Sequence, residues 1–170
     1  YTFKGILQNE GWLENRGVTI DRDGIIVDIE QVNTNEVDNG YALPGFQNAH
    51  SHAFQYAMAG LAEKNDANAT NGDFWSWREA MYRLALNISP DQLEDIAAML
   101  YAEMVRHGYT SVAEFHYVHH DKNGKPYGNL AEMGSRLVAA AETAGINITL
   151  VPIFYQKGGF GVAPNERQKR

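Results

Sequence analysis

Two histidines one residue apart, His50 and His52, are the side chains of this sequence best suited to chemistry. They follow Pro44-Gly45, a strong break signal, and a short run that predicts an extended strand. Side chains two positions apart on a strand point to the same face, so the two imidazoles would lie side by side. Such a pair predicts half of a metal site. A bare His-x-His also arises by chance among six histidines, so its context has to decide.

The other candidate residues each allow two interpretations. His116, His119 and His120 could be metal ligands, but consecutive histidines in a polar loop are also typical of exposed positions or of supporting roles around a site. Arg78 could pair with a substrate carboxylate or form a structural ion pair with a glutamate. Glu114 lies in the middle of an expected strand, which predicts an internal polar contact rather than catalysis.

The first 42 residues are predicted to form a small β module. Short apolar runs alternate with turn signals at residues 9–11, 15–17 and 21–24, and Asp23-Gly24 is a typical hairpin turn. No cluster of chemically competent residues occurs in residues 1–42. We therefore expect this module to have a structural role.

The clearest predicted helix spans residues 90–107. Ser89 precedes a proline and stands three residues before Gln92, which predicts an N-cap with a capping box. Apolar residues then recur at helical spacing, and Gly108 stands where a C-terminal glycine is common.

Strands are predicted on both sides of a second helix. The strands span residues 110–115 and 146–154, and the helix runs from near Asn129 to Gly145. Strands alternating with helices of this length imply parallel strands joined by right-handed crossovers. In such folds, sites are built at the carboxyl ends of the strands, where the histidines are expected.

Composition limits what such a site can bind. The 170 residues are 44% hydrophobic and 21% charged, as in ordinary soluble globular proteins. A net charge of −7 without a Lys/Arg cluster argues against a nucleic-acid partner. Without cysteine, a metal must be held by nitrogen and oxygen. No signal peptide or membrane-spanning pattern is present, so we expect a cytoplasmic protein with no membrane partner.

The motif in its context resembles the amidohydrolase superfamily, in which a His-x-His ends the first strand of a barrel. Longer strings look like the formimidoylglutamate deiminases, at residues 50–55, 57–63, 74–79 and 113–121. Together they extend the resemblance from about Leu43 to Gly161. Tyr56 departs from the arginine expected after Gln55, which affects a local contact rather than the family.

The resemblance implies an α/β fold. It implies the N-terminal part of an amidohydrolase-type (β/α)₈ TIM barrel preceded by a small β-sandwich module. Residues 1–42 would be this module and residues 43–170 the first three β/α units of an incomplete barrel. A barrel typically takes about 250 residues. We therefore expect residues 1–170 alone to be inactive, with the catalytic groups beyond Arg170 and a homo-oligomer at full length.

For the site, the resemblance implies one divalent metal ion, usually zinc. His50 and His52 would bind it together with a later histidine and an aspartate, and Gln55 and Tyr117 match positions that bind the substrate. The implied reaction belongs to histidine degradation. It is the hydrolytic deimination of N-formimidoyl-L-glutamate, a small-molecule substrate, to N-formyl-L-glutamate and ammonia.

Two other functions stay open at this point. Another aminohydrolase of the superfamily, acting on a purine, a pterin or a triazine, would share His50 and His52 but not the strings around Gln55 and Tyr117. A non-catalytic fragment or assembly module is the second alternative, since only three barrel strands are predicted. A histidine and an aspartate at later strand ends, beyond Arg170, would exclude the non-catalytic alternative.

Overall fold

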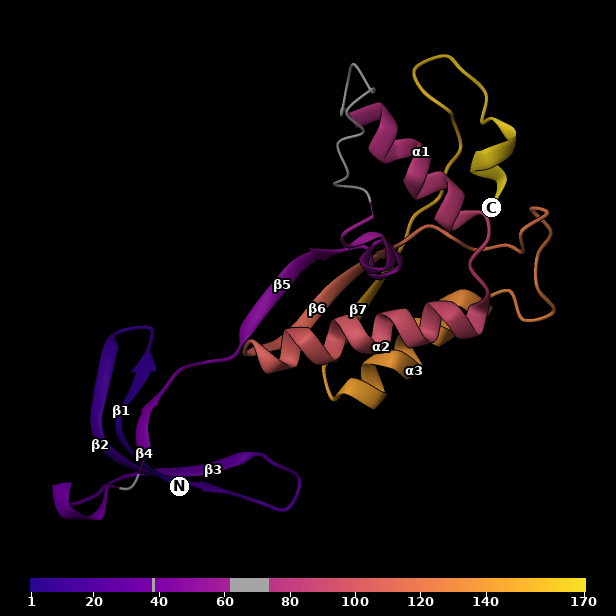
Figure 1. Cartoon of the computed structure of the whole chain (residues 1–170). Coiled ribbons are helices and arrows are strands. Elements are labelled where there is room, and N and C mark those ends of the chain that lie inside the picture. The colour runs from indigo at the N-terminus through magenta and orange to yellow at the C-terminus, as the bar shows by residue number, and fades with distance from the viewer. Residues whose placement is uncertain (38, 62–73) are drawn as a thin grey trace. The chain divides into compact units, whose positions relative to one another are not determined.

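The computed structural model describes residues 1–37, 39–61 and 74–170 (Figure 1). These residues divide into two compact units, Tyr1–Gly45 and Phe46–Arg170, which we call the β unit and the α/β unit. The sequence prediction placed the division three residues earlier, after residue 42. Part of the string at residues 57–63 lies outside the described residues.

One four-stranded sheet makes up most of the β unit. Its order is β3-β2-β1-β4, with antiparallel pairs β1/β2 and β2/β3 and a parallel pair β1/β4. The elements are β1 (Thr2–Gln8), β2 (Gly11–Ile20), β3 (Ile26–Gln31), the 3₁₀ turn η1 (Thr34–Glu36) and β4 (Asn39–Ala42). The sandwich expected from the sequence needs a second sheet, which the described residues of this unit do not supply.

The turns of the β unit were predicted in part. The hairpin at Asp23-Gly24 is confirmed, and Asp21 Oδ1 closes it by accepting hydrogen bonds from the backbone of Asp23 and Ile25, both at 2.9 Å. The turn predicted at residues 15–17 is wrong, because β2 continues through it. Asn15 adopts φ 48° inside the strand, a left-handed conformation that asparagine tolerates better than most residues.

A parallel three-stranded sheet is the centre of the α/β unit. The strands are β5 (Phe46–Ser51), β6 (Tyr109–His116) and β7 (Asn147–Pro152), in the order β5-β6-β7. Both strand pairs are parallel, which confirms the pairing expected from the alternation of strands and helices. The other elements are η2 (Ala53–Met58), α1 (Phe74–Ala85), α2 (Pro90–Arg106), α3 (Glu132–Ala144) and η3 (Glu166–Lys169).

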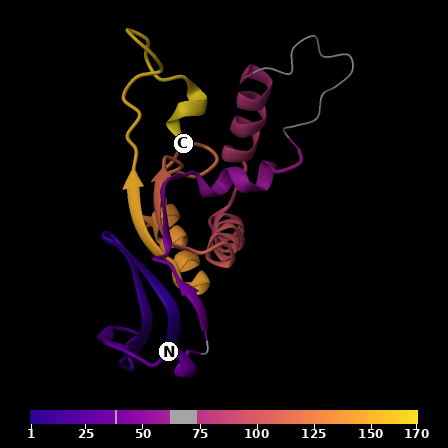
Figure 2. The ribbon, with the colours of Figure 1, turned by 90° about the vertical axis from the view of Figure 1, so that its left-hand side faces the viewer.

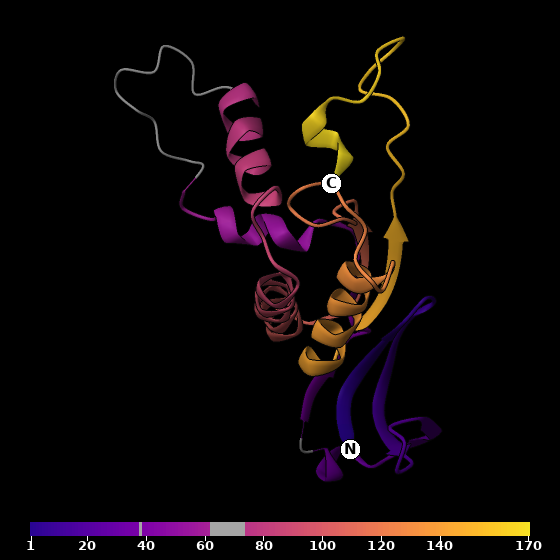
Figure 3. The same ribbon diagram turned by 90° about the vertical axis from the view of Figure 1, so that its right-hand side faces the viewer.

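Helices α2 and α3 lie side by side on one face of this sheet (Figure 2, Figure 3). The buried core fills the space between the sheet and the two helices, and it includes Leu93, Ala97 and Tyr101 of α2, Val112 of β6, and Met133, Leu137 and Ala140 of α3. No helix among the described ranges is long and apolar enough to cross a membrane.

The ends of α2 and α3 follow from local hydrogen bonds. Ser89 Oγ accepts the N–H of Gln92 at 3.2 Å, and the Gln92 side chain accepts the N–H of Ser89 at 3.0 Å, so the predicted capping box is confirmed. Helix α3 begins at Glu132, later than predicted, because the Asn129 side chain closes a turn before the helix by accepting the backbone N–H two residues on. It ends as predicted at Gly145, whose φ is 75°.

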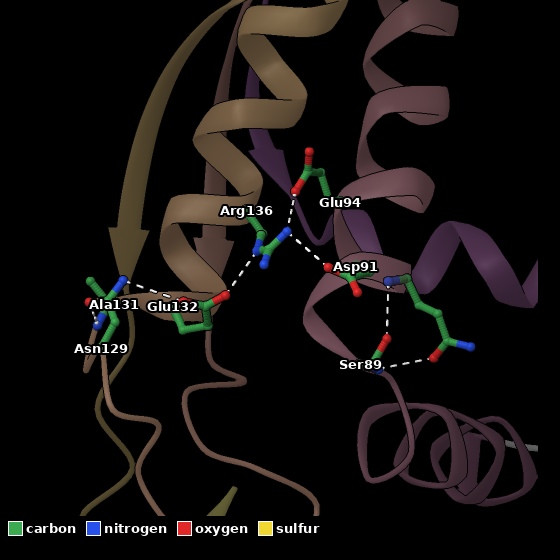
Figure 4. A network of polar contacts seen from close by, with 8 residues as sticks. Ser89, Asp91, Glu94, Asn129, Ala131, Glu132 and Arg136 are labelled. Atoms are coloured by element: carbon green, nitrogen blue, oxygen red, sulfur yellow. Dashed lines mark hydrogen bonds and ion pairs between the residues drawn. The ribbon is translucent and has the colours of Figure 1, made fainter.

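Charged side chains connect the exposed sides of α2 and α3 (Figure 4). Arg136 of α3 lies 2.9 Å from carboxylate oxygens of Asp91 and Glu94 on α2 and of Glu132 on its own helix. The guanidinium therefore joins the two helices that cover the sheet.

Candidate metal and substrate site

The two histidines of the motif converge at the carboxyl end of β5. His50 is the next-to-last residue of the strand, and His52 directly follows the strand. Their Nε2 atoms are 3.2 Å apart. Two nitrogen ligands of a tetrahedral zinc ion, each at about 2.0–2.1 Å from the metal, are about 3.3 Å apart. The spacing therefore fits two ligands of one ion.

The orientation of His52 is set by a backbone carbonyl. Its Nδ1 lies 2.9 Å from the carbonyl oxygen of Phe115, in the neighbouring strand β6. A carbonyl oxygen only accepts hydrogen bonds, so Nδ1 must carry the hydrogen and donate it. In the neutral ring this leaves Nε2 with its lone pair, which is the tautomer that a metal ligand needs.

His50 is held mainly by packing. Its ring lies against the ring of Phe115, with centroids 4.5 Å apart and an interplanar angle of 34°. Its backbone N–H donates to Asn48 Oδ1 at 3.1 Å. Phe115 therefore supports both histidines, one through its ring and the other through its carbonyl.

The described ranges, 1–37, 39–61 and 74–170, contain no group of three or more His, Cys, Asp and Glu side chains placed to hold a metal ion. A structural or catalytic zinc ion takes at least three protein ligands. His50 and His52 can therefore supply only part of a coordination sphere.

The two predicted substrate residues lie beside the histidines. Gln55 Nε2 donates to the hydroxyl of Tyr117 at 3.0 Å, although the residues are 62 positions apart in the chain. The Tyr117 ring meets the ring of His52 edge to face, with centroids 5.1 Å apart. The turn after β5 and the end of β6 thus bring His50, His52, Gln55 and Tyr117 to one place.

Tyr117 stays protonated over the physiological pH range. Burial raises the pKa of its phenol to about 12, and the hydrogen bond from Gln55 only partly opposes this. The hydroxyl also lies 3.6 Å from Met81 Sδ, a weak acceptor. A neutral phenol of this kind can exchange its thioether contact for a better acceptor.

Of the three histidines after Phe115, one is buried and two bind the backbone of surrounding loops. His116 is buried, so the exposed position considered for it is wrong. Burial, and to a smaller extent the neighbouring His119, lowers the pKa of His116 to about 4. His119 Nε2 lies 2.8 Å from the carbonyl of Ile153, and His120 Nδ1 lies 2.8 Å from that of Lys169. Both nitrogens donate hydrogen bonds to backbone carbonyl groups, so they connect loops to one another.

Arg78 lies on helix α1, whereas Glu114 lies in strand β6. The Arg78 guanidinium lies over the ring of Tyr82, 5.4 Å from its centroid, on the same helix α1. The internal polar contact predicted for Glu114 is observed, since its Oε1 accepts the backbone N–H of Ala53 at 2.6 Å. Phe115, by contrast, was not among the candidate residues predicted from the sequence. Strand alternation places it on the face opposite the buried Glu114, which is the signal that could have revealed it.

A hollow of about 410 Å³ opens beside Tyr117, and its lining includes His119, His120, Phe154 and Tyr155 but not His50, His52 or Gln55. This size suits a small molecule. A larger hollow of about 780 Å³ is lined by residues of the β unit, among them Trp12 and Tyr41. It contains no histidine, so we place the candidate site at the carboxyl end of the parallel sheet.

Comparison with known proteins identifies relatives along nearly the whole chain. The sequence model of the amidohydrolase family matches residues 41–155. Formimidoylglutamate deiminase from Pseudomonas aeruginosa is 49% identical over 165 residues, which cover 95% of this chain and 36% of that protein. The crystal structure of an amidohydrolase from Brucella melitensis superposes with a TM-score of 0.89 at 47% identity, over 99% of this chain and 38% of that one.

A more distant neighbour is atrazine chlorohydrolase TrzN from Arthrobacter aurescens, whose structure was solved in complex with zinc. Its TM-score is 0.63 at 19% identity, over 88% of this chain and 34% of that one. At this identity the likeness shows the fold alone. This chain spans little more than a third of the length of these relatives.

Proposed function

Because this chain belongs to the amidohydrolase family, we propose that it is the N-terminal portion of a metal-dependent deiminase. The proposed reaction is hydrolysis of N-formimidoyl-L-glutamate to N-formyl-L-glutamate and ammonia, in histidine degradation. One observation carries the proposal: the Nε2 atoms of His50 and His52 converge to 3.2 Å beside the hydrogen-bonded pair Gln55 and Tyr117. The 49% identity to a formimidoylglutamate deiminase supports the choice of substrate.

The proposed architecture is that of the whole family fold. The sheet β5-β6-β7 is the opening arc of a (β/α)₈ barrel, and the β unit is part of a small β-sandwich. The parallel pairing and the superposition on the Brucella melitensis amidohydrolase support this assignment. The proposal assigns no activity to residues 1–170 alone, since the remaining ligands and the proton-shuttling groups are expected beyond Arg170.

One divalent metal ion, zinc, would be held by His50 and His52 together with a later histidine and an aspartate. Zinc supplies a nucleophile at neutral pH, because it lowers the pKa of a coordinated water to about 7. The residues present fit this ion in two respects. The Nε2 spacing matches two zinc ligands, and the carbonyl of Phe115 holds His52 in the required tautomer.

The task of Gln55 and Tyr117 is to orient the substrate. The Gln55 amide donates through Nε2 to Tyr117, which leaves its carbonyl oxygen to accept a hydrogen bond from an amidine N–H. The Tyr117 hydroxyl can donate to a substrate carboxylate in place of its weak contact with Met81. Both groups are neutral, so neither adds a charge that would compete with the metal.

The test uses the full-length protein and two substrates. Zinc per subunit is measured by elemental analysis, and ammonia release is followed with formimidoylglutamate and, separately, with guanine. We expect one zinc ion per subunit and a clear preference for formimidoylglutamate. A preference for guanine would favour a purine aminohydrolase instead, and a metal-free protein inactive on both would favour the non-catalytic assembly module.

A further inference from the structure

We propose that Glu114 is a positioning residue, whose buried carboxylate holds the turn that carries His52 and Gln55. The inference deepens the proposed function and rests on it, because it takes His52 as a metal ligand and Gln55 as a substrate contact. Glu114 interacts with His52 electrostatically, and its hydrogen bond is made with the backbone between His52 and Gln55, through which it acts.

Glu114 reaches this turn from the neighbouring strand. It lies in β6 opposite Ser51 of β5, and both side chains are buried. Residues Val112, Glu114 and His116 alternate onto the buried face of β6, so the carboxylate lies on the side of the sheet covered by the helices. From there Oε1 accepts the backbone N–H of Ala53 at 2.6 Å.

The turn lacks a local cap, and Glu114 takes its place. Element η2 begins at Ala53, and its N-cap residue His52 makes no side-chain capping hydrogen bond. The His52 ring is committed to the carbonyl of Phe115 instead. The first N–H groups of a helical turn need an acceptor, and a carboxylate is a strong one. Here the acceptor comes from a residue 61 positions further along the chain.

Packing alone does not account for a carboxylate at this position. Glu114 is 2% exposed, and burial raises the pKa of its carboxyl, an effect that the hydrogen bond from Ala53 opposes. Within the described residues, Glu114 Oε2 and the Tyr101 hydroxyl are both buried without a hydrogen bond of good geometry, although Glu114 interacts more weakly with Tyr101 and with Ser51. An apolar side chain of similar volume would avoid this penalty. The contact with Ala53 is what such a side chain could not provide.

This one hydrogen bond controls two functional side chains. Ala53 directly follows His52, and Gln55 lies two residues further in the same turn, where its N–H donates to the His52 carbonyl at 3.0 Å. If the Ala53 N–H loses its acceptor, the turn loosens at its first residue. The ring of His52 and the amide of Gln55 then lose their fixed positions together.

The test compares three replacements in the full-length protein. Glu114→Gln keeps an acceptor for Ala53, whereas Glu114→Met removes it at similar volume, with Glu114→Leu as a second apolar replacement. Val112→Ala is the matched control, because Val112 lies two residues earlier on the same face and is also 2% exposed. Hydrogen exchange of peptides covering residues 53–58 is measured on the metal-free protein, and zinc affinity is measured by competition with a chelator.

We expect faster exchange in residues 53–58 and a zinc affinity lowered by about tenfold or more for Glu114→Met and Glu114→Leu. Glu114→Gln should keep wild-type exchange and a zinc affinity within about twofold of wild type, since its amide oxygen still accepts the Ala53 N–H. Val112→Ala should lower thermal stability without changing either quantity.

Three outcomes would overturn the inference. Apolar variants with wild-type exchange and zinc affinity would show that the contact does not hold the turn. A Glu114→Gln protein as impaired as Glu114→Met would show that the acceptor is not the important feature. In both cases the wild-type protein still binds zinc, so the proposed function stands. A wild-type protein without zinc affinity would instead remove both the inference and the metal site on which it rests.

Discussion

At the scale of single residues, two backbone contacts organise the candidate site. The carbonyl of Phe115 fixes the tautomer of His52, and the N–H of Ala53 is held by Glu114. The proposed function gives the side chains of the site two roles, metal binding and substrate binding. His50 and His52 present nitrogens to a common point, whereas Gln55 and Tyr117 bind one another beside it.

These roles predict different effects of substitution at the substrate residues. In the full-length protein, Gln55→Ala and Tyr117→Phe should keep wild-type zinc content and lower kcat/KM by about 10–100-fold, or about 1–3 kcal/mol, because each removes one or two hydrogen bonds to the substrate. Elemental analysis and steady-state kinetics measure the two quantities. Tyr109→Phe, which removes a hydroxyl away from the site, should change neither. Loss of zinc from Tyr117→Phe would contradict the separation of roles.

His116 predicts an acid-sensitive fold. In the folded protein burial lowers its pKa to about 4, from 6.5 for an ordinary histidine. The unfolded chain therefore binds a proton first as the pH falls. The resulting stabilisation is fully present above about pH 6.5 and is lost toward pH 4, at about 1.4 kcal/mol per pH unit.

Thermal unfolding between pH 7 and pH 4.5 measures this effect. The Tm of the wild-type protein should fall more steeply with decreasing pH than that of His116→Gln, which cannot take up the proton. His107 is exposed at the end of α2, so His107→Gln should keep the wild-type slope. Equal slopes for the wild-type protein and His116→Gln would contradict the assignment.

At the scale of elements, the ion-pair network of Arg136 joins α2 to α3 (Figure 4). The hydrogen bonds to Glu94 and Glu132 raise the pKa of Arg136, as expected for a guanidinium among carboxylates. The network is partly open to solvent, so its contribution to stability should be modest and sensitive to salt.

Arg136→Met should lower the Tm by a few degrees at most at low ionic strength, and the difference should shrink in 1 M NaCl as screening weakens the wild-type network. Arg106→Met is the matched control, because Arg106 pairs with Glu103 on its own helix and is largely exposed. It should have no measurable effect. A difference for Arg136→Met that is independent of salt would show that packing of its aliphatic stem matters more than charge.

Elements with local signals could be predicted from the sequence. The capping box at Ser89 and the glycine at Gly145 each involve residues a few positions apart, and both occur as expected. The predictions at Asn15 and Asn129 were wrong for different reasons. Asn15 adopts a left-handed backbone conformation inside β2 without ending the strand, whereas the side chain of Asn129 closes a turn that delays the start of α3. The sequence therefore predicted α2 together with its first residue and α3 with a start that is too early, and it did not predict α1.

The sequence could indicate candidate side chains for the site, but not the contacts that hold them in place. The motif spacing pointed to His50 and His52, but the tautomer of His52 depends on the Phe115 carbonyl, 63 residues away and brought close by the register of β5 on β6. The contact of Glu114 with Ala53 depends on the same register. Such contacts between strands have no local signal in the sequence.

At the scale of the whole molecule, this chain spans little more than a third of the length of its relatives and brings the Nε2 atoms of His50 and His52 together at the end of one strand. We expect His50 and His52 to bind the same metal ion in the complete protein. Metal binding can be measured without an assay of activity.

The most direct test is the zinc content of three full-length variants, His50→Ala, His52→Ala and His107→Ala, purified in parallel and measured per subunit by elemental analysis. Each of the first two removes one ligand from a four-coordinate ion, so both should lose most of their zinc, whereas His107→Ala should keep the wild-type amount. A His50→Ala or His52→Ala protein that retains full zinc would show that the replaced histidine is not a metal ligand.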